Sequence, residues 1–541
     1  MKLGVSRTRA RKAKSRDRNA KGSRRRLYAR RSLAISALSA LIWAVPMVFL
    51  TALSHFRWKT MAATAIAGNG FILAVGLLAC GFLARLLCPD LPGNIRKIVL
   101  ALLVSLLSLV PIVALLNVSD HLSSAYGWFE TIQFYLLPLS LAPLLATILL
   151  GPAEGIVLGM WVGFSASILG GHDYQILGTT VLVTICASRF GQDLRKRSTV
   201  FKAGLVIALS EILVAVAANL IDLPATEPMP MLMQASACLV NGMVTAVAVL
   251  LAVPIFEALF NITTDITLLE LSDLGHPLLQ RLAIEAPGTY HHSLVVANLA
   301  QAATHKIAAN SLLARVCSYF HDIGKLTKPD FFAENIQRSP NPHDGLLPSM
   351  STLVITAHVK EGVSLALLHK LPRPIIESIQ QHHGTGIVRY FHHKAVQQLE
   401  LELANGQTDA GGVINESDYR YPGPKPSFRE SAIISLADSV EAASRSMEKP
   451  NPGHLESMVN EVVNARLLDG QLDSCDLTMK DLARIKRSFV FTLTSMLHGR
   501  MAYPKDEDLD KQQSNGVPAQ PVRDQEARSE SDGASYGMQS G

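Results

Sequence analysis

Residues 32–260 constrain this 541-residue chain most, because they form an almost continuous series of apolar stretches. Stretches of about twenty residues fit the hydrocarbon core of a bilayer, roughly 30 Å thick at 1.5 Å per helical residue. The first stretch lacks a small-residue cleavage site and a second follows at once, which favours a membrane span over a signal peptide. The predicted spans are eight: 33–53, 61–84, 98–117, 132–150, 152–170, 173–188, 200–221 and 231–260.

The charges beside these spans predict their orientation. Residues 1–31 hold 14 Lys/Arg and one acid, a net +13, whereas the rest of the chain carries a net −7. Such an arm directly before a span is more often a cytoplasmic anchor than a nucleic-acid-binding segment, and no DNA partner is expected. The loop "SRFGQDLRKRSTVFK" has five Lys/Arg, whereas the loops "VSDHLSSAYGWFET", "GGHDYQ" and "IDLPATEPMP" have none. With eight spans, the N-terminus and everything after residue 260 lie in the cytoplasm of a multi-pass protein of the cell (inner) membrane.

The second half of the chain reads as helical throughout, without sustained strand-type alternation. The predicted fold class is therefore all-α, a polytopic helical membrane domain followed by a cytoplasmic all-helical domain. The predicted segments are a basic arm (1–31), a transmembrane domain (32–260), a connecting segment (261–284), the helical domain (285–500) and a disordered polar tail (504–541).

The stretch "SYFHDIGKL" sets a histidine beside an aspartate at the end of an apolar helix. His321 falls on the same helical face as Cys317 and Ala314, so it is expected to be buried. A charged Asp322 beside it is costly to bury without a compensating cation. Gly324 is expected to end the helix.

Four further helices carry imidazole or carboxylate groups in apolar contexts. A single histidine on an apolar face is usually a hydrogen-bonded core residue, and one aspartate can be a helix cap or a surface group. Five helices with the same feature favour a shared site instead. Five histidines and two aspartates suit a pair of borderline divalent ions, iron or manganese, with one carboxylate bridging. A closed zinc site needs four ligands, usually including thiols, and Cys317 has no partner thiol. The residues in the four further helices are His292 (with His291 before it), His358, His382, His383 and Asp438.

Together these motifs resemble the HD-domain phosphohydrolases, specifically the bacterial 7TM-HD family of cyclic-di-AMP phosphodiesterases. The stretches that carry the resemblance lie within 285–486: "EAPGTYHHSLVVANLA", "NSLLARVCSYFHDIGKL", "NPHDGLLPSMSTLVITAHVKEGV", "QQHHGTG", "YRYPGPKPSFRESAIISLADSVEAASRS" and "LTMKDLARI". The resemblance implies a membrane-bound phosphodiesterase that opens cyclic-di-AMP to linear pApA with a water activated by two metal ions, Mn²⁺ or Fe²⁺. It also implies the ligands: His292, His321, Asp322 and Asp438 for one ion, and Asp322 as bridge with His358, His382 and His383 for the other.

Other residues are candidates for contacting the cyclic dinucleotide. Lys325 follows the HD pair closely enough to hold a phosphate oxygen or assist the leaving group; the alternative is a solvated lysine at a helix end. Arg420, Tyr421 and Lys425 lie in "DYRYPGPKPSFRE", which is either an ordinary turn or a segment that contacts phosphate and base. Arg445 is seven residues past Asp438 and shares its helix face.

The sequence departs from the family in one respect. Members typically carry a large extracellular domain after the first span, and here only "SHFRWKT" lies there. An HD hydrolase of cyclic-di-GMP is a weaker alternative, because "HHGTG" lacks the GYP signature that follows in such enzymes. An HD ribonuclease is also weaker, because no KH-type GxxG module precedes the HD region. A non-catalytic nucleotide-binding receptor is expected to have lost ligands, and none is missing. A homodimer is possible.

Overall fold

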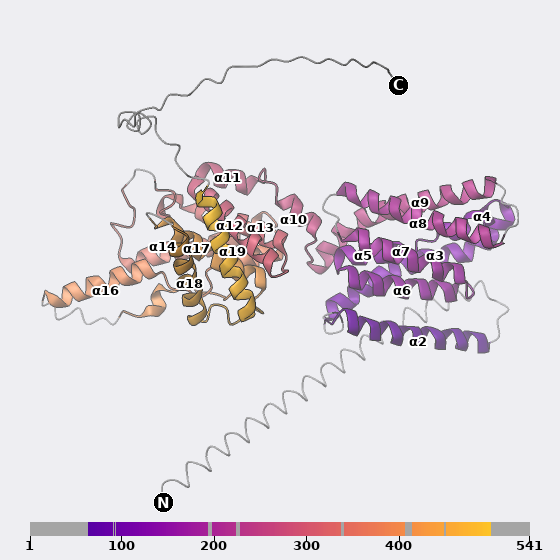
Figure 1. Cartoon of the computed structure of the whole chain (residues 1–541), viewed down its shortest axis with the longest axis horizontal. Coiled ribbons are helices and arrows are strands. Elements are labelled where there is room, and N and C mark those ends of the chain that lie inside the picture. The colour runs from indigo at the N-terminus through magenta and orange to yellow at the C-terminus, as the bar shows by residue number, and fades with distance from the viewer. Residues whose placement is uncertain are drawn as a thin grey trace, which may run out of the picture.

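The computed structural model describes residues 63–89, 91, 94–192, 197–222, 228–336, 340–405, 414–447 and 451–498. Two helical bodies are joined at α10 (Figure 1). The first contains α2 (Ala63–Leu87), α3 (Ile95–Ala125), α4 (Phe129–Ile132), η1 (Gln133–Leu136), α5 (Leu141–Leu149), α6 (Pro152–Leu169), α7 (Tyr174–Gly191), α8 (Arg197–Asp222) and α9 (Pro228–Phe260). The predicted first span, 33–53, and the predicted tail lie outside the described residues.

The second body continues with α10 (Asp265–Leu271), α11 (Pro277–Glu285), α12 (Pro287–Lys306), α13 (Ser311–Phe320), η2 (Ile323–Thr327), η3 (Pro329–Phe331), α14 (Pro348–Leu368), α15 (Arg373–Gln381), α16 (Arg389–Ala404), η4 (Glu416–Tyr419), α17 (Arg429–Arg445), α18 (Pro452–Leu468) and α19 (Met479–His498). Among the described residues the pairing of extended backbone is limited to one isolated bridge, Ile387 to Arg420. The predicted all-helical fold class is confirmed.

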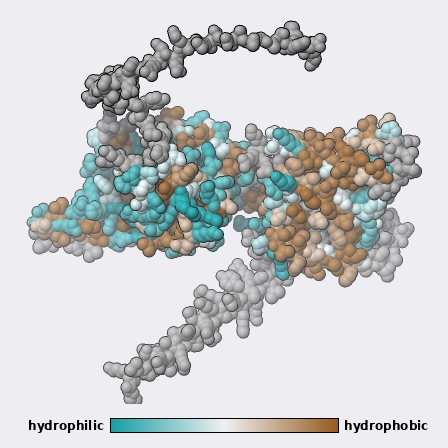
Figure 2. All heavy atoms as spheres, viewed as in Figure 1, coloured by the Kyte–Doolittle hydropathy of each residue, from teal (hydrophilic) through white to brown (hydrophobic). Residues whose placement is uncertain are grey.

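Seven helical segments of the described chain are long and apolar enough to cross a membrane by length and composition. Six of them precede residue 261; the seventh is α14, which packs on η2 and α15 in the second body. α7 is not among these seven segments, and it packs against both α6 and α8. Figure 2 shows the outer surface of this body to be predominantly apolar, as lipid contact requires, whereas the second body is largely polar.

The predicted span 132–150 is not one straight helix. The pass begins at Phe129, and α4, η1 and a bend precede α5, which is only nine residues long. Pro138 interrupts the ladder because proline has no N–H to donate. Beside this break the carbonyl oxygen of Leu137 accepts hydrogen bonds from the backbone N–H of Leu139 at 2.7 Å and from Nδ2 of Asn241 at 3.1 Å.

α8 and α9 are in direct backbone contact. A Cβ atom on Gly204 would lie 2.5 Å from the carbonyl oxygen of Gly242, and one on Gly242 would lie 2.3 Å from that of Gly204. Only glycine allows two helices to approach so closely. α9 is therefore held rigidly against its neighbour before it leads into α10.

The end of the membrane body nearest α10 is the basic end. Arg197, the first residue of α8, pairs with Glu270 of α10 through Nε–Oε1 and Nη2–Oε2 contacts of 2.7 and 3.2 Å. The alternating direction of the helices brings the other described Lys/Arg of this body to the same end: Arg85, Arg96, Lys97, Arg189 and Lys202. Basic residues concentrate on the cytoplasmic side of membrane proteins, so this end is the one expected to face the cytoplasm.

The second body has one continuous core with α12 at its centre, packed against α13, α17 and α19. The fully buried side chains include Leu299, Phe320, Ile434 and Phe489. α14 packs on η2, and α15 packs on α13 and α14. Five helices therefore meet around η2. Two of them contribute their C-terminal ends, α13 and α15, and three contribute their inner faces, α12, α14 and α17.

Candidate metal centre

The HD pair lies at the junction of two helices. α13 ends at Phe320, His321 is its C-cap, and Asp322 is the N-cap of η2. The prediction that Gly324 ends the helix is wrong, since it lies inside η2. Its role is close packing: a Cβ there would lie 1.9 Å from the carbonyl oxygen of His358 and 2.5 Å from the amide nitrogen of Gly362. Gly324 lets the HD pair approach α14.

The remaining histidines come from the faces and ends of other helices. On α12, His292 is buried and His291 is exposed, which follows from the turn of the helix. His358 is buried on α14. His382 and His383 follow α15, and Gly384 then adopts φ +57°, a conformation that suits glycine and reverses the chain.

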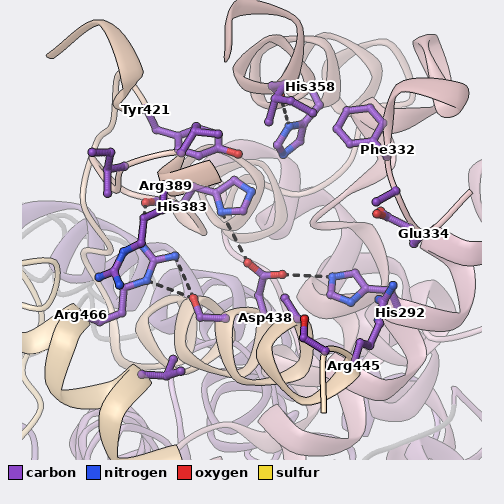
Figure 3. Close-up of a pocket in the computed structure, with 18 of the residues that line it drawn as sticks. His292, Phe332, Glu334, His358, His383, Arg389, Tyr421, Asp438, Arg445 and Arg466 are labelled. Atoms are coloured by element: carbon purple, nitrogen blue, oxygen red, sulfur yellow. Dashed lines mark hydrogen bonds and ion pairs between the residues drawn. The ribbon is translucent and has the colours of Figure 1, made fainter. Parts of the chain in front are cut away.

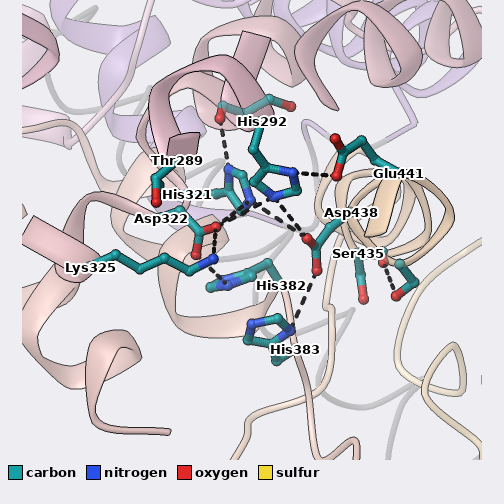
Figure 4. A network of polar contacts seen from close by, with 12 residues as sticks. Thr289, His292, His321, Asp322, Lys325, His382, His383, Ser435, Asp438 and Glu441 are labelled. Carbon is teal, nitrogen blue, oxygen red and sulfur yellow. Dashed lines mark hydrogen bonds and ion pairs between the residues drawn. The ribbon is translucent and has the colours of Figure 1, made fainter. Parts of the chain in front are cut away.

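The seven predicted ligands converge on two groups. The first ligand group is His292, His321, Asp322 and Asp438, and the second is Asp322, His358, His382 and His383; within each, the candidate ligand atoms lie within 4.8 Å of one another. Asp322 belongs to both (Figure 4). Its Oδ2 lies 3.4 Å from Nε2 of His292 and 3.3 Å from Nε2 of His321, while its Oδ1 lies 3.3 Å from Nε2 of His358. The two oxygens thus face different groups.

Asp438 also reaches toward both groups. Its Oδ1 lies 3.1 Å from Nε2 of His292, and its Oδ2 lies 3.5 Å from Nδ1 of His383 (Figure 3). The sequence did not predict this second contact. Asp438 therefore closes the site on the side opposite Asp322.

These residues fit divalent metal ions. Nε2 of His292, Nε2 of His321 and Oδ1 of Asp322 are buried and make no hydrogen bond, and leaving such atoms unpaired is costly. Ligand atoms about 2 Å from an ion stand roughly 3 to 4 Å apart, as most of the closest contacts here do. Imidazole and carboxylate donors suit iron, manganese and zinc, and the described donors include no cysteine. The two clusters therefore have the donors and spacing of a site for divalent metal ions.

The electrostatics of the site favour the ligand forms of His321, His358 and Asp322, whereas His292 is biased toward the protonated imidazolium. Burial lowers the pKa of His321 and of His358 to about 4, so both imidazoles are neutral at pH 7. Burial alone would raise the pKa of Asp322, but the Lys325 ammonium and neighbouring imidazoles hold it well below its usual range. For His292 the burial penalty is outweighed by contacts with Asp322, Asp438 and Glu441, which raise its pKa well above the ordinary value.

Lys325 is clamped beside the shared aspartate. Its Nζ lies 2.8 Å from Oδ2 of Asp322 and 2.6 Å from Oε1 of Glu334, and it sits 5.0 Å from the centre of the Phe332 ring. Burial, which would lower the pKa of Lys325, is outweighed by the two carboxylates, which raise it. Lys325 is therefore a fixed positive charge at the edge of the site.

A cavity of about 590 Å³ opens directly over the two ligand groups. Of the four predicted substrate contacts, Tyr421 and Arg445 line it, and the ring of Tyr421 stacks on His383 with centroids 4.2 Å apart. Arg420 does not line it, because its guanidinium is bound by Glu416 and Asp469. Lys425 does not line it either, and its Nζ lies 3.5 Å from Asp473.

Several residues of the site were not predicted. Arg389 and Arg466 line the cavity, and Arg466 is held by the hydroxyl of Ser439 at 2.8 Å. Glu441 bonds His292, and it could have been found from its spacing, since it lies one helical turn past Asp438. Glu334 follows η3 in an irregular segment, where no periodicity marks it.

Family models match both halves of the chain. Residues 63–264 match the model described as "7TM receptor with intracellular HD hydrolase", and residues 289–443 match the HD domain. The chain therefore belongs to the family of multi-pass membrane receptors that carry an intracellular HD hydrolase domain, and its second body contains the HD domain. The predicted family is confirmed.

The curated relatives are more specific. The chain is homologous to the protein named "Cyclic-di-AMP phosphodiesterase PgpH" of Bacillus subtilis, with 36% identity over 378 residues, which is 69% of this chain and 51% of that protein. The protein of the same name from Listeria monocytogenes is 34% identical over 377 residues, again 69% of this chain and 51% of the relative. The chain spans about half the length of these relatives.

A solved structure is also similar. The crystal structure of the L. monocytogenes PgpH HD domain in complex with cyclic-di-AMP is 42% identical in sequence and covers 41% of this chain. The match spans 98% of that structure, with a TM-score of 0.38.

Proposed function

We propose that this protein is a metal-dependent phosphodiesterase of the inner membrane that hydrolyses cyclic-di-AMP to linear pApA. The observation that carries the proposal is the pair of buried ligand groups sharing Asp322, open to a cavity in a chain homologous to proteins named cyclic-di-AMP phosphodiesterases. The reaction class follows from the donors and the cavity. The adenine dinucleotide follows from the homology.

The ligand assignment is part of this proposal. The first ligand group would hold one divalent ion and the second the other, with Asp322 bridging, and Mn²⁺ or Fe²⁺ suits the imidazole-rich donors. Two bound ions would supply charge neutralisation on the phosphate and a nucleophile at neutral pH.

The chain's own residues orient a dinucleotide. Lys325 presents a fixed positive charge beside the shared aspartate and would hold a phosphate oxygen. Arg389, Arg445 and Arg466 line other parts of the cavity and would attract the phosphodiester anion. The exposed side of the Tyr421 ring, which already stacks on His383, would receive a base by the same kind of contact. Arg420 and Lys425 would act at most on the outer parts of a ligand.

The topology supports an N-terminus and an HD domain on the cytoplasmic side. The described Lys/Arg of the membrane body gather at the end next to α10, and cytoplasmic cyclic dinucleotides would then reach the cavity directly. A homodimer remains a prediction.

A substrate competition tests the proposal. Full-length protein in lipid nanodiscs with Mn²⁺ is offered cyclic-di-AMP, cyclic-di-GMP and a short RNA in parallel, with products measured by mass spectrometry. We expect pApA as the main product. Cleavage of cyclic-di-GMP or RNA alone would contradict the substrate assignment. Tight nucleotide binding without turnover would instead favour a receptor.

A further inference from the structure

The ligand histidines are supported in two different ways. His321, His358 and His382 each bond a backbone carbonyl three residues earlier through Nδ1, at 2.8, 2.6 and 2.7 Å. The acceptor is neutral in all three. His292 instead places Nδ1 2.6 Å from Oε2 of Glu441, a carboxylate from a helix 149 residues further along the chain.

This difference makes the two ligand groups unequal in charge. The first group contains Asp322 and Asp438, and Glu441 adds a third carboxylate directly behind His292 (Figure 4). The second group has Asp322 as its one carboxylate ligand and three histidines, two of which rest on backbone carbonyls. A carboxylate behind a ligand histidine fixes the ring and makes its free nitrogen a stronger donor.

Glu441 is itself held from the cavity side. Its Oε1 lies 2.7 Å from Nε of Arg445, and its Oε2 lies 2.9 Å from Nη2 of the same side chain. Glu441 is 4% exposed, whereas the Arg445 side chain is 39% exposed and lines the cavity. Two parallel contacts of this kind fix a carboxylate in orientation as well as position.

We propose that Glu441 is a positioning residue that fixes His292 and makes the first ligand group the tighter of the two ion sites, with Arg445 holding Glu441 in place. The inference rests on the two-ion assignment in the proposed function. In this inference Arg445 orients Glu441 even when no substrate is bound.

The inference is tested by measuring Mn²⁺ affinity in the absence of substrate. Binding to the full-length protein in nanodiscs is detected by electron paramagnetic resonance. His358→Ala disables the second group and leaves the first; His321→Ala does the reverse. Glu441→Gln keeps the size and an acceptor but removes the charge. We expect it to weaken Mn²⁺ binding roughly 10- to 100-fold in the His358→Ala background and by less than about twofold in the His321→Ala background.

Glu430→Gln is the matched control, because Glu430 lies on the same helix and its Oε1 accepts from the backbone of Asn310 at 2.7 Å, away from both groups. It should change neither affinity. The inference is overturned if Glu441→Gln weakens Mn²⁺ binding equally in both backgrounds. It is also overturned if Glu441→Gln does not weaken Mn²⁺ binding in the His358→Ala background. If a background variant does not fold, the wild-type chain replaces it, and Glu441→Gln must then shift the tighter of two binding phases alone.

Arg445→Met separates positioning from substrate contact. We expect weaker Mn²⁺ binding in the first group with no substrate present, smaller than the effect of Glu441→Gln. An unchanged Mn²⁺ affinity with a raised KM would overturn the holding role of Arg445. Because ions are measured without turnover, normal two-phase binding in a chain that does not hydrolyse cyclic-di-AMP would refute the proposed function and leave this inference standing.

Discussion

The membrane body and the HD body both bury polar side chains between helices, but they use them differently. In the membrane body, Ser105, Thr147 and Thr180 bond carbonyls of their own helices four residues earlier, at 2.9, 2.7 and 2.7 Å. In the HD body, imidazoles and carboxylates from five separate parts of the chain point at a common centre. Hydroxyl groups satisfied within one helix need no further partner, whereas converging charged groups require an ion. The proposed metal-dependent reaction is therefore assigned to the second body.

Loss of Asp322 should give the largest effect, because this side chain is the one shared by both ligand groups. Asp322→Ala should lower turnover at least about 10³-fold and remove bound metal, since neither group keeps its bridge. Insertion of the membrane body should be unchanged. Hydrolysis, metal content and membrane extraction are the measurements.

The chain contains a second HD pair that serves as control. His343 is buried against Phe331 and Phe391, its Nε2 bonds the carbonyl of Phe331 at 3.0 Å, and Asp344 lies exposed in a turn. Asp344→Ala should retain turnover within about twofold. A similar loss in both variants would mean that the fold, not the shared aspartate, is being measured.

Removal of the ions should destabilise one body and spare the other. An ion at a free concentration of 100 times its Kd stabilises the folded state by about 2.7 kcal/mol. Without the ions, the buried carboxylates repel each other. We expect a chelator to abolish activity and to speed amide exchange in α13, η2 and α14.

The positions of the tryptophans allow the response of the two bodies to ion removal to be measured separately. The chain has four tryptophans, and all precede residue 261, including the buried Trp161. Tryptophan emission therefore comes from residues before 261 and not from the HD body, and it should not change with the chelator. A matching change in emission would show that the two bodies respond as one unit.

A pair of glycines separates packing from catalysis. A Cβ on Gly324 would meet backbone atoms of α14, and a Cβ on Gly242 would meet backbone atoms of α8. Either Gly→Ala change should cost about 1–3 kcal/mol of stability, because backbone must move apart. Gly324→Ala should also lower kcat roughly 100-fold by displacing His358 from Asp322. Gly242→Ala should leave kcat within about threefold, and a larger loss would couple α8–α9 packing to the site.

The ligand set was predictable because imidazoles and carboxylates are conspicuous on apolar helix faces. His292, His358 and Asp438 are buried polar residues in helices that are largely apolar around them, and the turn of α12 separates His292 from its exposed neighbour His291. Family resemblance supplied the division of ligands between two ions. Six of the predicted spans correspond to described segments that are long and apolar enough to cross a membrane, apart from the break at Pro138; the span 173–188 forms α7, which falls short of that test, and 33–53 lies outside the described residues.

The surroundings of the ligands were less predictable. Arg420 and Lys425 were candidates for contacting the substrate because they lie in "DYRYPGPKPSFRE", with an ordinary turn as the alternative. Nearby acids engage both, and sequence does not reveal which partner a cation finds. Arg466 reaches the cavity from α18 because of how α18 packs on α17. Gly324 showed the same limit: a glycine after a helix usually ends it, and here it serves a close contact between elements far apart in sequence.

The smallest effect on turnover and stability is expected for Glu211. This residue is an exception in the membrane body, because its buried carboxylate bonds a side chain of another helix. This carboxylate is 2% exposed, and Nδ2 of Asn241 lies 3.1 and 3.2 Å from its two oxygens. Asn241, in α9, also bonds the carbonyl of Leu137, which lies between η1 and α5. Its amide therefore links α9 to α8 and to the segment that contains Leu137. Glu211→Gln should change stability and turnover little, whereas Glu211→Leu should cost about 1 kcal/mol, because one amide hydrogen loses its acceptor. If Glu211→Gln alters turnover more than about threefold, the membrane body holds a functional carboxylate of its own, and chemistry is not confined to the HD body.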